Sequence, residues 1–578
     1  MNQKPKNISS FSGLYKQLFE YKTAIIQVLA LQFLWVLFEL IFPFLTQALV
    51  DQGINHQDID FIYLLLLGQL FLFFGIITSD FLRLWLLRHI GIRINLKLVN
   101  AYLNDLLFKK FLFFNNKKQG ELIQHINDNL RIETFMTASS VNFVSAIFKI
   151  IVFGVVLFIF SPTIGGIFGI SFILILLWDF FFLRYREQID NERFEVGSIM
   201  RSQLMEVLEG LIDIKTNNLE PDRLNNWQYV QDLFARNRLK ILRIYQFYQG
   251  FNLAIGQLRD ILILFVAAFA VLGGTMSLGA MLAIQYILGQ LSKPTTDIMQ
   301  FVQDWQDAKL SLGRLSEVTL ESEKEYEPDT YIPSIRYEKD IILEDVQFSY
   351  KDIPTIKKIS FGIPYGNKLA LVGKSGSGKS TIIKILLKLL ETERGEVKVG
   401  LQRIHHLNHK TWRENCSFVS QDGFIFSNTL RFNITLTEDA AAIDFDLLNK
   451  AIEFSCLDQI MESLPKGVDT LIGRGGQLFS KGQSQRILIA RAIYKNGNYL
   501  IMDEPTSALD NVTAREVIQN IETFFAGKTI IVATHKLKLF EHVDEILMID
   551  EGQIIEKGNF AALMTKKGAY YEQRKGLE

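Results

Sequence analysis

Six long apolar segments in the first half of the chain constrain its fold more than any other feature. About 20 consecutive apolar residues are enough for a helix to cross the hydrocarbon core of a bilayer. An apolar share of 49% and a mean hydropathy of +0.17 agree with a chain that lies largely in lipid. The predicted spans are Ala24–Val50, Phe61–Leu87, Val141–Phe160, Ile164–Leu183, Leu253–Leu272 and Leu278–Leu291. The last is short, and a helix that continues past Ser292-Lys293-Pro294 would lengthen it.

Basic residues alternate between the segments that connect these spans. The N-terminal residues 1–23 contain four lysines, and the stretches 88–131 and 184–243 are rich in both Lys and Arg. The links 51–60, 161–163 and 273–277 contain neither residue. Because basic loops stay on the cytoplasmic side, the pattern predicts both termini in the cytoplasm and three short external links.

The two basic connections are too long for simple turns between spans. Their helical pattern predicts that the spans continue as helices beyond the membrane and turn back near residues 113–120 and 210–217. We expect a short helix at each turn that docks on the second half of the chain. The alternative is a solvated loop, since turn residues alone are a weak signal.

Ionisable residues inside the predicted spans are a second unusual feature, because charges are costly in lipid. They either line a polar path or form structural pairs near the span ends, and for most of them both interpretations stay open. For Glu39 we favour the functional one. The candidates are Glu39, Asp80, Arg83, Lys149, Asp179, Arg259 and Asp260.

A glycine-rich loop dominates the second half of the chain and fits the pattern G-x-x-x-x-G-K-[ST]. The apolar run Leu369–Val372 before it predicts a buried strand, and Thr381–Leu387 after it predicts a helix. In this context backbone N–H groups wrap a polyphosphate, Lys379 adds a positive charge, and the Ser380 hydroxyl can bind Mg²⁺. The predicted nucleoside triphosphate site consists of Gly373, Lys374, Ser375, Gly376, Ser377, Gly378, Lys379, Ser380 and Thr381.

A second strand, predicted for Tyr499–Met502, ends in two carboxylates. Carboxylates at the carboxyl end of a strand face the crevice where ligands bind in α/β sheets. Asp503 can hold Mg²⁺ through water, and Glu504 can orient or deprotonate an attacking water.

Composition sets further limits. Residues 321–340 are acidic, contain two prolines and predict a linker, after which strand and helix patterns alternate as in an α/β domain. A formal net charge of -1 gives no support to a nucleic-acid partner. Two cysteines, Cys416 and Cys456, argue against a disulfide scaffold or a zinc cluster.

Two motifs in the second half carry a family resemblance. Residues 480–486, Ser-Lys-Gly-Gln-Ser-Gln-Arg, and 503–510, Asp-Glu-Pro-Thr-Ser-Ala-Leu-Asp, resemble the ATP-binding cassette of ABC transporters. The spans with two long connections are similar to the membrane domain of ABC exporters, so the resemblance covers nearly the whole chain. It implies a multidomain membrane protein: an all-α, six-helix, type IV exporter-like transmembrane domain followed by an α/β P-loop cassette with a helical subdomain. The expected boundaries are a cytoplasmic segment 1–23, a transmembrane domain 24–318, a linker 319–340 and a cassette 341–578.

The resemblance also implies roles for individual residues. Tyr350 corresponds to the aromatic residue that stacks on adenine, and His535 to the switch histidine at the γ-phosphate. Gln421 corresponds to the glutamine that meets Mg²⁺ and the attacking water. The implied catalytic set is Glu504, His535 and Gln421, and the implied Mg²⁺ set is Ser380, Gln421 and Asp503. Ser480, Gly482 and Gln483 match the signature motif, which binds the ATP of the opposite subunit.

Since one cassette does not complete its own site, the resemblance implies a second half-transporter as partner, most simply in a homodimer. ATP and Mg²⁺ are the implied cofactors. The implied activity is that of an ATPase that exports a substrate, a peptide or an amphipathic compound, across the bacterial cytoplasmic (inner) membrane. The alternatives are a lipid or drug exporter or flippase, and an ATP-gated channel or sensor.

Within exporters, residues 41–54 resemble bacterial peptide and bacteriocin exporters, including those fused to a cysteine peptidase. The segment before Ala24 has no room for that peptidase and no Cys, so we expect leader cleavage to need another protein.

The cassette departs from the family pattern at two positions. Lys481 replaces the first glycine of the usual Leu-Ser-Gly-Gly-Gln, and Arg474 stands where exporters often have Glu. We expect activity to be retained, because Ser480, Gly482 and Glu504 are in place.

Overall fold

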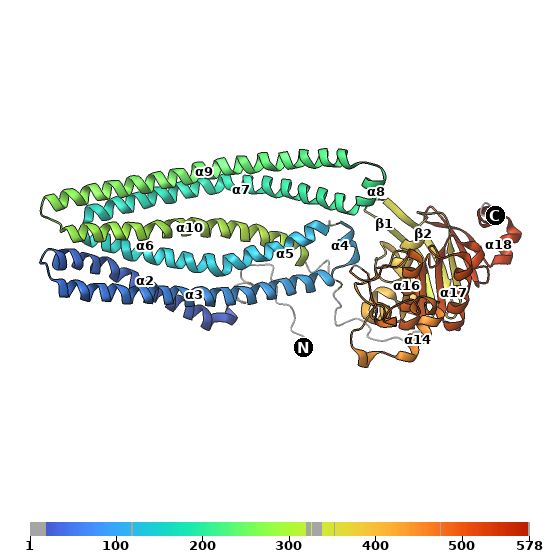
Figure 1. Cartoon of the computed structure of the whole chain (residues 1–578). Helices are drawn as coiled ribbons and strands as arrows, with labels where there is room; N and C mark the ends of the chain where they lie inside the picture. Colours follow the sequence, from blue (N-terminus) through green and yellow to red (C-terminus); the bar gives the residue numbers. More distant parts are fainter. Residues whose placement is uncertain are drawn as a thin grey trace. The chain divides into compact units, whose positions relative to one another are not determined.

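A computed structural model of the protein describes residues 19–116, 119–319, 325, 338–351, 353–473 and 475–575. The chain divides into two compact units (Figure 1). Residues 1–109 and 116–324 belong to the first unit, and residues 110–115 and 325–578 to the second. Most of the N-terminal segment 1–23 and of the predicted linker 319–340 lies outside the described residues.

Long helices build the first unit (Figure 1). Five of the six predicted spans each lie inside one of them, and the first, 24–50, runs from one helical element directly into the next, so the helical fold expected for this half is confirmed. The elements are η1 (Phe19–Tyr21), α2 (Lys22–Ala48), η2 (Leu49–Ile54), α3 (Ile59–Leu107), α5 (Gln119–Thr134), η3 (Phe135–Ser139), α6 (Ser140–Phe160), α7 (Pro162–Glu209), α8 (Leu211–Thr216), α9 (Glu220–Leu272) and α10 (Leu278–Thr319).

Five helical segments among the described residues are long and apolar enough to cross a membrane. They are Phe19–Ile54, Ile59–Leu107, His125–Phe160, Pro162–Phe182 and Glu220–Leu272. The sixth predicted span begins α10, which continues through Pro294 as expected but lacks a stretch as long and as apolar as those in the five segments. Ala283, Ile287 and Leu291 of α10 are fully buried among neighbouring helices. Because this helix faces protein over much of its surface, it needs less apolar surface toward lipid.

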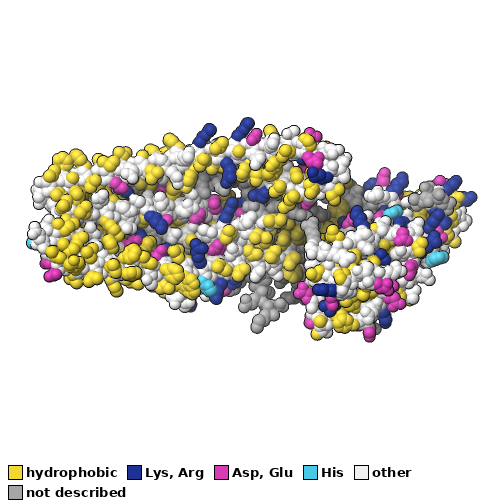
Figure 2. All heavy atoms as spheres, viewed as in Figure 1, with side chains coloured by type: hydrophobic (Ala, Val, Ile, Leu, Met, Phe, Trp, Pro, Cys, Tyr) yellow, Lys and Arg dark blue, Asp and Glu magenta, His cyan; other side chains and the backbone are white. Residues whose placement is uncertain are grey.

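Apolar side chains cover the outer surface of the first unit over much of its length (Figure 2). Phe71, Phe81, Phe181 and Leu272 are each more than two-thirds exposed. Contiguous apolar surface of this kind is unfavourable in water and favourable in hydrocarbon. The first unit is therefore a membrane domain.

The helices α3, α7 and α9 are much longer than a bilayer requires. Helix α3 has 49 residues, about 70 Å at the usual rise, against a hydrocarbon core of about 30 Å. The predicted helical extensions are thus present. A helix of six residues lies at each predicted turn, α4 (Phe111–Asn116) and α8 (Leu211–Thr216).

The start of α4 belongs to the second unit. Phe111 and Leu112 pack against one of its two apolar cores. The Lys384 ammonium lies 5.4 Å from the centre of the Phe111 ring, and Lys110 pairs with Glu391 at 3.0 Å. The chain therefore enters the second unit for residues 110–115 before it returns to the first.

The second unit has the α/β fold expected of this half. A six-stranded sheet has the order β12-β11-β3-β10-β9-β6, in which all neighbouring strands except β12 are parallel. A four-stranded antiparallel sheet has the order β2-β1-β4-β5. The strands are β1 (Ile341–Tyr350), β2 (Ile353–Ile363), β3 (Lys368–Val372), β4 (Arg394–Val399), β5 (Gln402–Arg403), β6 (Cys416–Val419), β7 (Asn428–Thr429), β8 (Leu471–Ile472), β9 (Tyr499–Asp503), β10 (Thr529–Thr534), β11 (Glu545–Asp550) and β12 (Gln553–Gly558).

Helices pack around these sheets and form a helical region between β6 and β9. The α-helices are α11 (Lys379–Leu386), α12 (His409–Glu414), α13 (Leu430–Thr435), α14 (Phe445–Phe454), α15 (Asp458–Met461), α16 (Lys481–Lys495), α17 (Asn511–Phe524), α18 (Phe560–Lys566) and α19 (Ala569–Lys575). Single 3-10 turns are η5 (Ile404–His406), η6 (Ala440–Ala442), η7 (Gly467–Asp469) and η8 (Leu537–Leu539).

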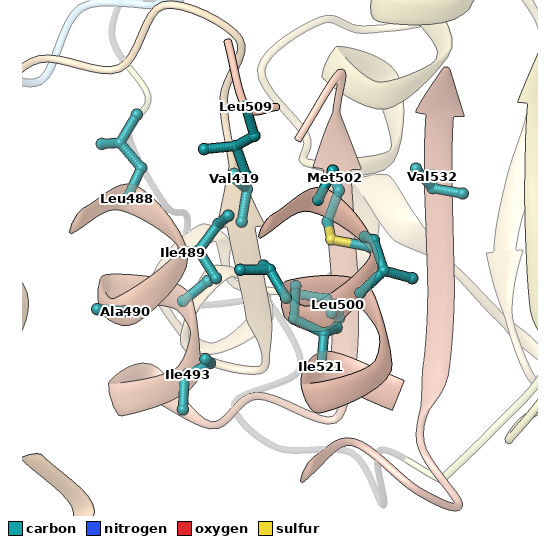
Figure 3. Packing of buried hydrophobic residues seen from close by; sticks show 14 of the residues in the cluster. Val419, Leu488, Ile489, Ala490, Ile493, Leu500, Met502, Leu509, Ile521 and Val532 are labelled. Carbon is teal, nitrogen blue, oxygen red and sulfur yellow. The ribbon is translucent and has the colours of Figure 1, made fainter. Parts of the chain in front are cut away.

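The parallel sheet is apolar on both faces because side chains alternate along each strand. Leu500 and Met502 of β9 point to the core that also contains Ile489, Ile521 and Val532 (Figure 3). Ile501, between them, belongs to the opposite core, with α11 and the antiparallel sheet. Continuous apolar runs therefore make these strands, and both faces are buried.

Ile521 tests the packing of the core that contains α16 and α17. Its side chain is 1% exposed. We expect Ile521→Ala to lower the stability of the second unit by about 2–5 kcal/mol through the cavity it leaves. The exposed Gln519→Ala on the same helix should change it by less than about 0.5 kcal/mol. Hydrogen-exchange protection of β9 and β10 in the full chain measures the loss of stability in each variant. Equal losses in the two variants would contradict the role of Ile521 in the core.

Candidate nucleotide site

The glycine-rich loop joins the end of β3 to the start of α11. The helix begins at Lys379, two residues before its predicted start at Thr381. Gly378, the residue before it, has φ +106°, and a Cβ there would lie 2.7 Å from Ile356 Cδ1. A side chain would thus clash with β2 and strain the backbone. The loop therefore places backbone N–H groups at the helix N-terminus, where anions bind.

Two polar groups inside the loop fit a phosphate ligand. Lys379 is buried and donates to the carbonyl oxygens of Gly373 at 2.8 Å and Lys374 at 2.9 Å. Burial lowers the pKa of Lys379, and the nearby Glu504 and Asp503 carboxylates oppose that shift. The Ser377 hydroxyl is buried and has no hydrogen-bond partner among the described residues. Phosphate oxygens would satisfy it, so the loop fits the triphosphate of ATP.

Two of the three residues predicted to hold Mg²⁺, Ser380 and Asp503, are in contact with one another at this loop. The Ser380 hydroxyl hydrogen-bonds to the Asp503 carboxylate at the end of β9. Burial raises the pKa of Asp503, and the hydrogen bond from Ser380 partly offsets that shift. In the described part of the chain no three His, Cys, Asp or Glu side chains form a metal-binding group. The Ser380 hydroxyl and the Asp503 carboxylate are oxygen ligands that suit Mg²⁺, which keeps several waters and uses phosphate oxygens as further ligands.

The three residues predicted to act in catalysis come together from three strand ends. Gln421 Nε2 donates to Glu504 Oε2 at 3.2 Å. His535 Nδ1 lies 3.1 Å from Glu504 Oε1. They follow β6, β9 and β10, which are adjacent in the sheet, so their carboxyl ends share one edge. The arrangement can orient a water molecule through the carboxylate.

Glu504 itself has a backbone conformation that the sequence did not predict. Its φ is +49°, in the left-handed region that non-glycine residues rarely adopt. Its N–H donates to the Ala533 carbonyl oxygen on β10 at 2.9 Å. Such a backbone persists only where its surroundings hold it.

Tyr350 lies on the antiparallel sheet next to the loop. It ends β1 and pairs with Ile353 of β2. Two residues farther along β2, the Thr355 carbonyl oxygen would be 3.3 Å from a Cβ at Gly378. The predicted adenine-stacking residue thus pairs with the strand that flanks the loop, and its ring packs edge-on against Phe348.

The predicted signature residues form the start of α16. The Ser480 hydroxyl accepts from the Gln483 N–H at 3.2 Å, and Gln483 Oε1 accepts from the Ser480 N–H at 2.9 Å. This capping box fixes the helix N-terminus. No hydrogen bond joins Ser480 or Gln483 to the loop 373–380 among the described residues. Lys481 is exposed at the first helical position, and Arg474 lies outside the described residues.

Two residues near the site had no predicted role. Gln485 and Lys536 hydrogen-bond to the backbone of residues 504–509. Gln485 follows the signature residues, and Lys536 follows His535. The only sign in the sequence of a role for these two residues is that each lies next to a predicted site residue. The hydrogen bonds themselves join residues far apart in the sequence, so no local pattern indicates them.

All seven candidate ionisable residues in the predicted spans have partners in the first unit. Glu39 pairs with Lys149 at 2.6 Å, and the Lys149 ammonium lies 3.5 Å from the centre of the Trp35 ring. The remaining contacts are Arg83 with Asp80 at 2.6 Å, Arg259 with Asp260 at 2.9 Å, and Asp179 with Tyr248 and Asn252. These are the contacts that the structural interpretation predicts, and the functional interpretation of Glu39 stays a prediction.

Comparisons with known proteins agree with the fold of both units. The family model described as ABC transporter matches residues 356–507, and that described as ABC transporter transmembrane region matches residues 25–295. A bacterial Atm1-family ABC exporter solved with ATP bound has a TM-score of 0.87 to this structure. That comparison covers 96% of this chain and 98% of the exporter chain at 21% identity, and it shows a common fold.

Curated relatives match along nearly the whole chain. One is the lactococcin-G-processing and transport ATP-binding protein LagD of Lactococcus lactis subsp. lactis, 27% identical over 98% of this chain and 79% of the relative. Another is the toxin RTX-I translocation ATP-binding protein of Actinobacillus pleuropneumoniae, which is 25% identical over 97% of this chain and 79% of the relative. The leukotoxin translocation ATP-binding protein LktB of Mannheimia glucosida is 25% identical over 97% of this chain and 79% of the relative. The chain therefore belongs to the ABC transporter family, with an exporter-type membrane domain and an ATP-binding cassette on one polypeptide.

Proposed function

We propose that this half-transporter hydrolyses ATP at the described site and uses the energy to export a peptide across the cytoplasmic membrane. The observation that carries the hydrolytic part is the contact of Gln421 and His535 with the two oxygens of Glu504. The substrate class rests on the similarity of 97–98% of the chain to proteins named for lactococcin and toxin translocation.

The residues of the site have different roles in hydrolysis. Lys379 and the loop N–H groups bind the phosphates, and Ser380 and Asp503 would hold Mg²⁺. When bound, Mg²⁺ neutralises charge that develops on the phosphate oxygens. Glu504 orients the attacking water and accepts its proton, while Gln421 and His535 hold the carboxylate.

Dimerisation supplies the part of the site that one cassette lacks. Ser480, Gly482 and Gln483 stand at the N-terminus of α16 and make no hydrogen bond to the described part of the loop 373–380. We propose that they bind the ATP held by a second half-transporter, most simply a second copy of this chain. Bound ATP then stabilises the closed pair of cassettes, and hydrolysis of the ATP lets the pair open. This cycle of closing and opening couples ATP hydrolysis to conformational change in the membrane domain.

Glu504→Gln tests the proposed role of the carboxylate. We expect ATP hydrolysis to fall by about 10²- to 10⁴-fold, because the amide does not accept the proton of water. ATP binding should persist, since Lys379 and the loop are unchanged. Steady-state hydrolysis and nucleotide binding of the full chain in lipid measure the two effects. The exposed Glu516→Gln on α17 is the control, and hydrolysis that survives Glu504→Gln would refute the assignment.

The proposed orientation places both termini in the cytoplasm. We expect a cysteine at His56, in the link after η2, to react with a membrane-impermeant maleimide in intact cells. A cysteine at Arg236, on the long extension of α9, should react only after lysis. The natural Cys416 and Cys456 are both buried and give low background. The reverse labelling pattern would overturn the orientation.

Transport by vesicles tests the substrate class. We expect inside-out vesicles that contain the protein to accumulate labelled peptides with ATP, and Glu504→Gln to abolish the accumulation. ATP-dependent movement of a labelled lipid or drug instead would show the corresponding exporter or flippase. Conductance without accumulation would show a channel.

A further inference from the structure

The turn that follows Glu504 is held by side chains from outside it. Within the turn, the Ser507 N–H donates to the Glu504 carbonyl oxygen at 3.2 Å, and the Leu509 N–H to that of Thr506 at 3.2 Å. The turn leads into α17, whose first N–H groups are capped by Asp510. Glu504 is thus the first residue of a compact segment, 504–510, between β9 and α17.

Gln485 of α16 bonds to this turn at its first residue, Glu504, and at Ala508. Its side chain is buried. Nε2 donates to the Glu504 carbonyl oxygen at 2.8 Å, and Oε1 accepts from the Ala508 N–H at 2.9 Å. The amide supplies the donor and the acceptor that these two places require. Leucine would lose both bonds, and glutamate would lose the donor to Glu504.

The first turn of α16 also contacts Ala508 directly. A Cβ at Gly482 would lie 2.8 Å from the Ala508 carbonyl oxygen. The Ala508 carbonyl therefore packs against Gly482 while the Ala508 N–H bonds to Gln485. The signature glycine has a packing role in addition to the predicted approach to phosphate.

Lys536, which follows the turn in the sequence, also holds it, whereas Gln485 precedes the turn. Its ammonium donates to the carbonyl oxygens of Thr506 at 2.6 Å and Leu509 at 3.2 Å. Its own N–H donates to the Thr534 hydroxyl at 2.9 Å. Since Lys536 follows His535, one short segment contacts both the Glu504 carboxylate and the backbone behind it.

We propose that Gln485 and Lys536 are positioning residues for ATP hydrolysis, which hold the backbone of residues 504–509 so that the Glu504 carboxylate stays between Gln421 and His535. The inference rests on the proposed role of Glu504. The φ of +49° at Glu504 gives the reason such support is needed. Gln485 fixes the Glu504 carbonyl group, and Lys536 fixes the far side of the turn.

Gln485→Leu and Lys536→Ala in the full-length chain in lipid test the proposal. We expect kcat for ATP hydrolysis to fall roughly 10- to 100-fold, because small displacements of a reacting group cost rates of that order. The dissociation constant for ATP should stay within about twofold, since the loop 373–380 is untouched. Lys536→Arg, which keeps a charged donor, should retain most of the activity. The matched controls are Gln519→Leu and Lys538→Ala, both at exposed positions.

A second measurement separates positioning from general loss of structure. In a Glu504→Gln background, Gln485→Leu should give no further loss of the residual hydrolysis, because the group it positions is already disabled. Unchanged kcat in Gln485→Leu and Lys536→Ala would overturn the proposal. A parallel loss of kcat, ATP binding and thermal stability would overturn it too, as would additive losses with Glu504→Gln. If Gln485→Leu does not fold, Gln485→Glu, which keeps an acceptor for Ala508, is judged by the same criteria.

The test distinguishes this inference from the proposed function. If wild type hydrolyses ATP and Glu504→Gln abolishes hydrolysis while both positioning variants keep full activity, only the inference fails. If wild type does not hydrolyse ATP, the proposed function fails first.

Discussion

The parallel pairing of β6, β9, β10 and β3 is the constraint on which the candidate site depends. Gln421, Glu504, His535 and Gly373 follow these strands, and the chain does not otherwise bring them near one another. Parallel strands place their carboxyl ends at one edge, so four separate sequence segments converge there. The sheet is stable because apolar side chains cover both of its faces. The chemistry at the edge therefore rests on packing in the interior.

In the membrane domain the main constraint is different, because charged side chains lie in helices that face lipid. Glu39 and Lys149 are each buried and neutralise one another between α2 and α6. Trp35 adds its ring to the ammonium group, a cation–π contact that strengthens when water is excluded. Removing one partner of such a pair would leave a buried charge, which costs more than the pair contributes.

Much of the architecture could be predicted from the sequence because it depends on local patterns. Long apolar segments predict helices, the run 499–502 predicts β9, and the Ser480 and Gln483 spacing is that of a capping box. The contacts that complete the site are not local. Gln485 reaches a carbonyl 19 residues away and Glu39 an ammonium 110 residues away, and no periodicity in the sequence indicates either pairing. The left-handed backbone at Glu504 is likewise imposed by its neighbours in the fold.

The short excursion at residues 110–115 has a consequence for how the protein can be divided. Phe111 and Leu112 come from the first half of the gene but complete an apolar core of the second unit. A fragment cloned from residue 325 onward would leave the surface under these two side chains uncovered and lose the partner of Glu391. Such a fragment would be prone to self-association there, so behaviour measured on it would describe a truncated fold.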